Sequence, residues 1–246
     1  GNINRNAEFV NVNGSLFFKS GWYGSEYGNK LWKTDESTTI DLGDFKYLEY
    51  LECVNNTLFF FGRLTSTDSM SLWKSDGTPD GTTRLTQTSV SVNNEFGFNP
   101  IVNVNGILYF SAKNQFGEEL WKSDGTANGT VIVKDINPNG SSSPKFLTNL
   151  NGVLYFVAND GTTGDELWKS DGTQNGTVAV KDIRPGATSS RIYDMVNVNG
   201  VLYFTANDGT EREIWKSDGT EQGTVRLKDV ISEFDFTHPN FLTKFD

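Results

Sequence analysis

Hydrophobic residues in this chain fall into short runs that are separated by glycine-containing turns. The clearest copy of the pattern occupies residues 145–183, where Asn151-Gly152 separates the first two runs. Asn-Gly is a strong hairpin signal because a type I′ turn needs positive φ at both central residues. No stretch shows a helical period. The pattern predicts four antiparallel strands in this copy, at residues 146–150, 153–158, 166–170 and 177–183.

The second predicted strand of every copy is apolar on both sides instead of alternating with polar residues. A strand of this kind needs cover on both faces of its sheet. Each blade of a β-propeller lies between two neighbours, which provide that cover, whereas a single open sheet leaves one face wet. The second strands contain residues 16–18, 58–60, 108–110, 154–156 and 202–204.

One tryptophan returns in the third predicted strand of each copy, at intervals of 41, 48, 47 and 47 residues. A period of this length is typical of propeller blades. We therefore predict an all-β fold, a five-bladed β-propeller of about 47-residue four-stranded antiparallel blades. The tryptophans then pack between blades, since aromatic side chains bury large areas. They are Trp32, Trp73, Trp121, Trp168 and Trp215.

The predicted propeller is a single domain over residues 1–246, although its end does not match five equal copies. Residues 240–246 repeat the first-strand pattern without the strands that should follow. The alternatives are an incomplete six-bladed ring or a fragment of a longer array. The approximate blades are residues 8–45, 46–92, 93–138, 139–186 and 187–235.

The repeated motif Glu-Leu-Trp-Lys-Ser-Asp-Gly-Thr, as at residues 166–173, resembles the ELWxxDGT repeat family of bacterial proteins. The resemblance covers nearly the whole chain and implies a secreted or cell-surface location, but it assigns no settled chemistry. The Ser-Asp-Gly-Thr part also resembles the Asp-box turn of sialidase-like propellers, in which the Asp closes a hairpin. Calcium binding is the alternative for the loops at Asp160-Gly161 and Asp208-Gly209, although the spacing of an EF-hand is absent.

Charge and composition narrow the function classes. The net charge of −10 without a basic cluster argues against binding nucleic acid, and no apolar run is long enough for direct membrane insertion. His238 and Cys53 are the only residues of their types, so a His/Cys metal site is excluded by count and no cofactor is expected. The carboxylate pairs Glu118-Glu119 and Asp165-Glu166 leave a glycosidase or lyase as an alternative, but their recurrence favours a structural role.

Loops between the second and third strands are the predicted ligand-binding region, because recognition residues concentrate on loops of rigid scaffolds. Three aromatic residues lie among glycines in the first such loop, where they either bind a ligand or cap the core. We expect a non-catalytic recognition or adhesion module for a glycan or surface protein; a structural scaffold subunit of a surface assembly is the alternative. The candidate residues are Trp22, Tyr23, Tyr27, Phe116, Asn159, Asp160, Asn207 and Asp208.

Replacing Trp22 and Tyr23 with alanine tests whether these rings bind a ligand. We expect the double variant to bind its glycan or protein partner more weakly at an unchanged melting temperature, because a ligand-facing ring contributes little to the core. Calorimetric unfolding and binding are measured on the same sample. A variant that merely unfolds assigns both rings to the core.

Overall fold

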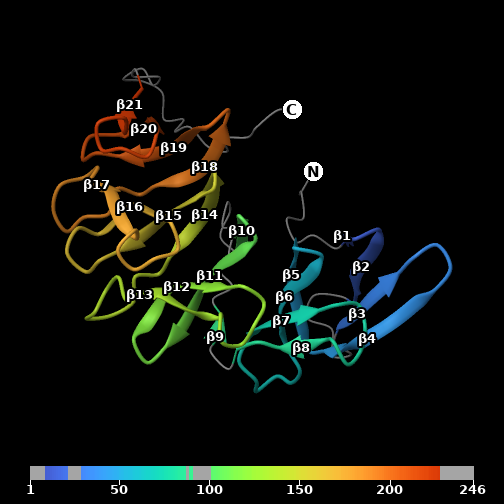
Figure 1. The fold of residues 1–246 in the computed structure, drawn as a ribbon. Helices are drawn as coiled ribbons and strands as arrows, with labels where there is room; N and C mark the ends of the chain where they lie inside the picture. The colour runs from blue at the N-terminus through green and yellow to red at the C-terminus, as the bar shows by residue number, and fades with distance from the viewer. Residues whose placement is uncertain (1–8, 22–28, 87–88, 91–100, 228–246) are drawn as a thin grey trace. The chain divides into compact units, whose positions relative to one another are not determined.

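The structure is a computed structural model that describes residues 9–21, 29–86, 89–90 and 101–227. Every regular element in these residues is a β-strand, and the strands form five sheets that follow one another in chain order (Figure 1). The all-β prediction is confirmed, and so are the repeated four-stranded sheets. The predicted surplus strand at residues 240–246 lies outside the described residues.

The strands of each sheet keep their sequence order, and the predicted limits agree to within a few residues. The first sheet contains β1 (Phe9–Val12), β2 (Ser15–Ser20), β3 (Asn29–Thr34) and β4 (Thr39–Phe45). The second contains β5 (Tyr47–Val54), β6 (Thr57–Arg63), β7 (Ser71–Ser75) and β8 (Thr83–Arg84).

The remaining strands form three further sheets with the same order. The third contains β10 (Ile101–Val104), β11 (Ile107–Asn114), β12 (Gly117–Ser123) and β13 (Val131–Lys134), together with the two-residue strand β9 (Ser89–Val90). The fourth contains β14 (Lys145–Leu150), β15 (Val153–Asn159), β16 (Asp165–Ser170) and β17 (Val178–Lys181). The fifth contains β18 (Tyr193–Val198), β19 (Val201–Asn207), β20 (Arg212–Ser217) and β21 (Val225–Arg226).

Backbone contacts divide the chain into two compact units. Unit 1 contains the first two sheets with β9, Gly106–Leu108 and Ser123–Val131, and its core includes Phe17, Phe60 and Trp73. Unit 2 contains the rest of the third sheet and the last two sheets, and its core includes Tyr155, Phe204 and Trp215. In each unit the core lies where consecutive sheets pack face to face.

The Asn-Gly turns have the predicted geometry. In the turn between β14 and β15, φ is 53° at Asn151 and 82° at Gly152, and the Asn13-Gly14 turn is nearly identical with 50° and 82°. Both central residues therefore have positive φ, as a type I′ hairpin requires. This geometry connects the first and second strands of a sheet with the right-handed twist that the strands need.

The second strands are buried on both faces in the second, third and fourth sheets, as predicted. The consecutive side chains at the centres of β6, β11 and β15 are all buried. The first sheet differs, because Leu16 of β2 is 38% exposed and Phe18 is only half-buried. Trp73, Trp121, Trp168 and Trp215 are buried, which confirms their predicted packing role, while Trp32 is only half-buried.

Side-chain hydrogen bonds connect the turns of consecutive sheets. The lysine that follows three of the tryptophans donates from Nζ to the glycine carbonyl of the next Asp-Gly-Thr turn: Lys74 to Gly125 at 2.8 Å, Lys122 to Gly172 at 2.9 Å and Lys169 to Gly219 at 2.9 Å. Turn asparagines do the same at the Asn-Gly turns: Asn55 donates to the Gly106 carbonyl at 3.1 Å and Asn105 to the Gly152 carbonyl at 3.0 Å.

Two glycines with the same φ of 82° separate backbone strain from crowding at these turns. Gly14→Ala places a Cβ in open space and should lower the free energy of unfolding by about 1 kcal/mol through backbone strain alone. Gly152→Ala should cost more, because its Cβ would lie 2.8 Å from Nδ2 of Asn105 and disturb the hydrogen bond between the turns. Urea unfolding measures both, and equal losses would contradict a role for the Asn105 contact.

Candidate functional site

The Asp-Gly-Thr turns use their carboxylates to hold the backbone. Oδ1 of Asp171 accepts hydrogen bonds from the Thr173 amide at 2.8 Å and from the Thr173 hydroxyl at 2.7 Å. Asp76, Asp124 and Asp218 make the same pair of bonds in their turns. Because these bonds favour the ionised form, they lower the pKa of each of the four carboxyl groups. The Asp therefore closes each hairpin, as the resemblance to Asp-box turns implies.

The carboxylates of the predicted acidic loop residues also accept hydrogen bonds from groups of their own loops. Oδ1 of Asp160 accepts four hydrogen bonds, two from the amides and two from the hydroxyls of Thr162 and Thr163, at 2.8–3.1 Å. Asp208 Oδ1 accepts bonds from the amide and hydroxyl of Thr210, and its Oδ2 lies 3.5 Å from an Arg226 nitrogen. Among the described residues, no three Asp, Glu, His or Cys side chains gather as a metal site would need.

The predicted asparagines hold the same loops from the other side. Oδ1 of Asn159 accepts the Gly161 amide at 2.7 Å, and its Nδ2 donates to Asp165 at 3.2 Å. Asn207 accepts the Gly209 amide at 2.7 Å in the equivalent loop. Each of these side chains is half-buried, so the loops present a pre-formed backbone and not free acidic groups.

Buried glutamates fasten the third strands to the segments that lead to the next sheet. Glu166 in β16 accepts the Ile183 amide at 2.9 Å and the Ser190 amide at 3.1 Å, and Glu119 in β12 accepts the Ile136 and Ser142 amides at 2.9 and 3.0 Å. Burial raises the pKa of both groups, that of Glu166 to about 7, against the opposing effect of the hydrogen bonds. These carboxylates therefore have a structural role, because they hold the third strand to the segment that leads to the next sheet.

Phe116 does form part of a concave surface in unit 2. Its side chain is 49% exposed in the loop between β11 and β12, and it lines a hollow of about 230 Å³. β13 and the residue after it line this hollow: Ile132 supplies apolar surface, and Asp135 follows the strand with a carboxylate whose buried Oδ1 has no hydrogen-bond partner among the described residues. We call this site the Phe116 hollow; its lining is Phe116, Ile132, Val133, Lys134, Asp135 and Gln174.

Two polar side chains line the Phe116 hollow. One is held in place by the protein and the other is exposed to solvent. Lys134 Nζ donates to the Thr177 carbonyl at 2.8 Å and lies 5.8 Å from the centre of the Trp168 ring, which holds the ammonium group in place. Gln174 is exposed in the turn between β16 and β17, so its amide is free to turn toward a ligand. The hollow thus combines an exposed aromatic face with a carboxylate and an amide.

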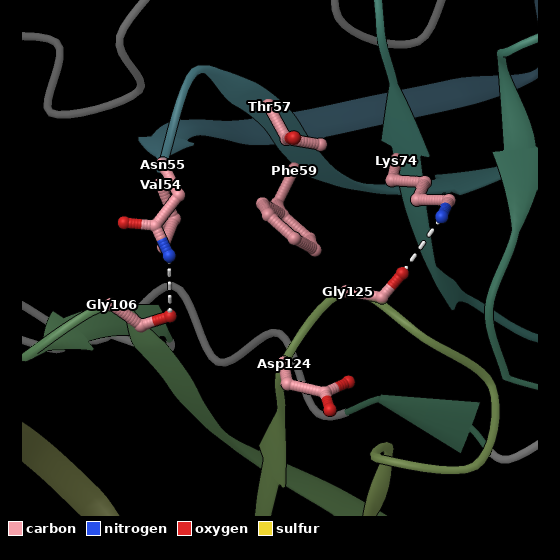
Figure 2. Close-up of a pocket in the computed structure, with 8 residues that line it drawn as sticks. All are labelled: Val54, Asn55, Thr57, Phe59, Lys74, Gly106, Asp124 and Gly125. Carbon is pink, nitrogen blue, oxygen red and sulfur yellow. Dashed lines mark hydrogen bonds between the residues drawn. The ribbon is translucent and has the colours of Figure 1, made fainter.

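A second hollow lies in unit 1, beside β6. Figure 2 shows the Phe59 ring between two hydrogen bonds, from Asn55 to Gly106 and from Lys74 to Gly125, with Asp124 below them. This hollow has a volume of about 240 Å³. We call it the Phe59 hollow; its lining is Val54, Asn55, Thr57, Phe59, Lys74, Gly106, Asp124 and Gly125.

Of the predicted site residues that the structure describes, Phe116 lines one of these two hollows, and Asn159, Asp160, Asn207 and Asp208 line neither. Trp22, Tyr23 and Tyr27 lie outside the described residues, as does His238. Sequence reasoning missed Asp135 and Gln174, although the pair Lys134-Asp135 recurs in the next copy as Lys181-Asp182. Gln174 carried no signal, because it reaches the hollow from the next copy.

Comparisons with known proteins identify the fold only. No family model matches the chain, and no curated protein matches its sequence. The chain is similar to the solved structures of a puromycin hydrolase (14% identity, TM-score 0.57, 93% of this chain and 38% of that chain) and of a mutant of it complexed with PGG (13%, 0.58, 92% and 38%). It is also similar to a puromycin-hydrolyzing peptidase of Mycobacterium tuberculosis (11%, 0.52, 86% and 36%).

These likenesses define the class of fold. The solved neighbours are β-propeller proteins, and the chain shares their repeat of four-stranded antiparallel sheets. The chain spans well under half of each solved chain. At identities this low, the similarity shows a β-propeller-type fold and nothing about chemistry. No helix in the described residues has the length and apolar content needed to cross a membrane.

The raised pKa of Glu166 makes stability depend on pH. The folded protein holds this proton more tightly than the unfolded chain, whose carboxyl has its ordinary pKa of 4.5. The free energy of unfolding should therefore fall as the pH rises from 4.5 to about 7 and then level off, by a total on the order of 1–3 kcal/mol from this group.

Urea unfolding at about pH 5 and about pH 8 measures this change. Glu166→Gln removes the titration and should flatten the difference between the two pH values, although losing one acceptor lowers stability at both. Glu36→Gln, at an exposed position, is the matched control and should keep the wild-type difference. An undiminished difference in Glu166→Gln would show that other groups cause it.

Proposed function

We propose that this protein is a non-catalytic recognition module that binds a glycan through the Phe116 hollow. The observation that carries the proposal is the combination of a half-exposed aromatic ring with an apolar floor, a carboxylate oxygen without a partner among the described residues, and an amide in one concave site. Ligand sites are typically concave and mainly apolar, with a few well-placed polar groups.

The chemistry of the Phe116 hollow fits a sugar. The ring of Phe116 offers an apolar face to the C–H groups of a pyranose, and Ile132 extends that surface. The carboxylate of Asp135 accepts hydrogen bonds from hydroxyl groups, while the Gln174 amide both donates and accepts.

We propose that the protein has no catalytic role, because its paired carboxylates are already bonded to other groups of the protein. Glu119 and Glu166 are buried and bonded to backbone amides. Their neighbours are engaged too, since Glu118 accepts the Ser111 hydroxyl at 2.9 Å and Asp165 pairs with Lys145 at 2.8 Å. Glycoside hydrolysis needs two carboxyl groups that flank an accessible bond. These pairs serve the scaffold instead.

The architecture and the location that we propose for the module are based on the sequence resemblance and on the number of sheets. We propose a ring closed by five blades, one for each observed sheet, in a member of the ELWxxDGT repeat family that is secreted or held at a bacterial cell surface. Its net charge of −10 favours a neutral or basic partner over nucleic acid or an anionic membrane. The partner is a glycan, free or carried on a surface protein.

Phe116→Ala tests the proposed site. We expect affinity for the glycan selected on an array to fall about tenfold or more, because the stacking surface is lost, with no change in melting temperature since the ring is half-exposed. Phe9→Ala is the matched control, as it removes a 62% exposed phenylalanine from β1 in unit 1. Calorimetric titration measures both variants.

Two results would overturn the proposal. One is full binding by Phe116→Ala, which places the glycan elsewhere. The other is an array on which no glycan binds while a partner subunit co-purifies with the protein, which favours the structural scaffold. Turnover of a polysaccharide that is lost in Glu166→Gln would instead support a glycosidase or lyase.

A further inference from the structure

The aromatic residue beside the Asp-Gly-Thr turn differs between copies. Tyr109 in β11 and Tyr155 in β15 place their hydroxyls against Gly172 and Gly219 of the following turns, where any added Cβ would collide with the tyrosine oxygen. Each hydroxyl lies close enough to the turn aspartate for its charge to act on it: burial, and then the charge of Asp171 or Asp218, raises the tyrosine pKa. At these two positions a tyrosine hydroxyl fills the space beside the turn glycine.

The same position in the second sheet lacks the hydroxyl. Phe59 occupies the place of Tyr109 and Tyr155, and its Cζ points at Gly125, 3.1 Å from where a Cβ on that glycine would lie. The Phe59 hollow remains beside this ring, with a volume of about 240 Å³. The space that a tyrosine oxygen takes in the later copies is therefore open here.

The residues that line the Phe59 hollow include both hydrogen-bond donors and hydrogen-bond acceptors. Lys74 is fixed by its 2.8 Å bond to the Gly125 carbonyl, and Asn55 by its 3.1 Å bond to the Gly106 carbonyl, as Figure 2 shows. The Asp124 carboxylate lies within the electrostatic reach of Lys74, and Thr57 lines the opposite side. A group that enters between them must donate to a carboxylate or carbonyl and accept from an ammonium or amide, which is what a hydroxyl does.

We propose that the Phe59 hollow is a second binding site, which takes the hydroxyl-bearing end of a saccharide in the space that a tyrosine hydroxyl fills in the later copies. This inference rests on the proposed function, because it assigns a further subsite for the same class of ligand. It differs in position, since all the lining residues of the Phe59 hollow belong to unit 1 and those of the Phe116 hollow belong to unit 2. The two sites can thus be removed one at a time.

The test exchanges phenylalanine and tyrosine between copies. In a Phe116→Ala background, which removes the first site, Phe59→Tyr should fill the hollow and weaken binding of methyl pyranosides about tenfold or more, at an unchanged or higher melting temperature. Tyr109→Phe in the same background should open an equivalent hollow and double the number of bound pyranosides. Calorimetric titration with methyl glucoside, galactoside and mannoside gives affinity and stoichiometry, and glycerol serves as the small polyol probe.

Each outcome separates this inference from the proposed function. If Phe116→Ala protein binds no methyl pyranoside, or if Phe59→Tyr binds as well as its parent, the hollow holds only water and the inference is wrong. In both cases the proposed function stands as long as Phe116→Ala lowers binding in the otherwise wild-type protein. If that substitution has no effect while Phe59→Tyr abolishes binding, the ligand site is the Phe59 hollow and the Phe116 hollow is not a site.

Discussion

The hydrogen bond from a lysine ammonium to the glycine carbonyl of the next turn is the interaction on which the rest of this structure depends. A second strand that is apolar on both faces gains stability only when a neighbouring sheet covers it, and Lys74, Lys122 and Lys169 fix where the neighbouring turn lies. The turn presents its carbonyl because its aspartate holds the adjacent amides, so local and long-range bonds support each other. Both hollows lie beside residues that this joint positions.

The repeated polar residues serve the scaffold, whereas the aromatic residues that line the two hollows depart from the repeat. The carboxylates of Asp160 and Asp171 accept hydrogen bonds from groups of their own turns, and that of Glu166 accepts one from a backbone amide of the segment that leads to the next sheet. Phe116 and Phe59 are different. Phe116 has no aromatic counterpart in the matching loops of later copies, and Phe59 stands where the three later copies have tyrosine. Function in a repeat protein of this kind is therefore found by looking for departures from the consensus.

Local rules in the sequence predicted most of the fold. The Asn-Gly pairs predicted the type I′ turns because positive φ is a property of the dipeptide itself, and the apolar triplets predicted the doubly buried strands. The exposure of Leu16 was not predictable, since it depends on what covers one sheet and not on the strand. Contacts between copies escaped prediction for the same reason: Asn55 and Lys74 bond to residues 51 positions away, and Gln174 reaches the Phe116 hollow from another sheet.

The lysine bonds also have a direction, since the donor always belongs to the earlier copy and the acceptor to the later one. The turn asparagines Asn55 and Asn105 bond in the same sense. The asparagines near the ends of two first strands bond in the opposite sense, from Asn149 to the Asn103 carbonyl and from Asn197 to the Asn149 carbonyl. The third and fourth copies therefore carry both halves of a head-to-tail joint, so consensus copies of this kind are compatible neighbours. Gene duplication within such an array adds interchangeable modules without redesigning an interface, so copy number is free to evolve separately from the joint that holds the copies together.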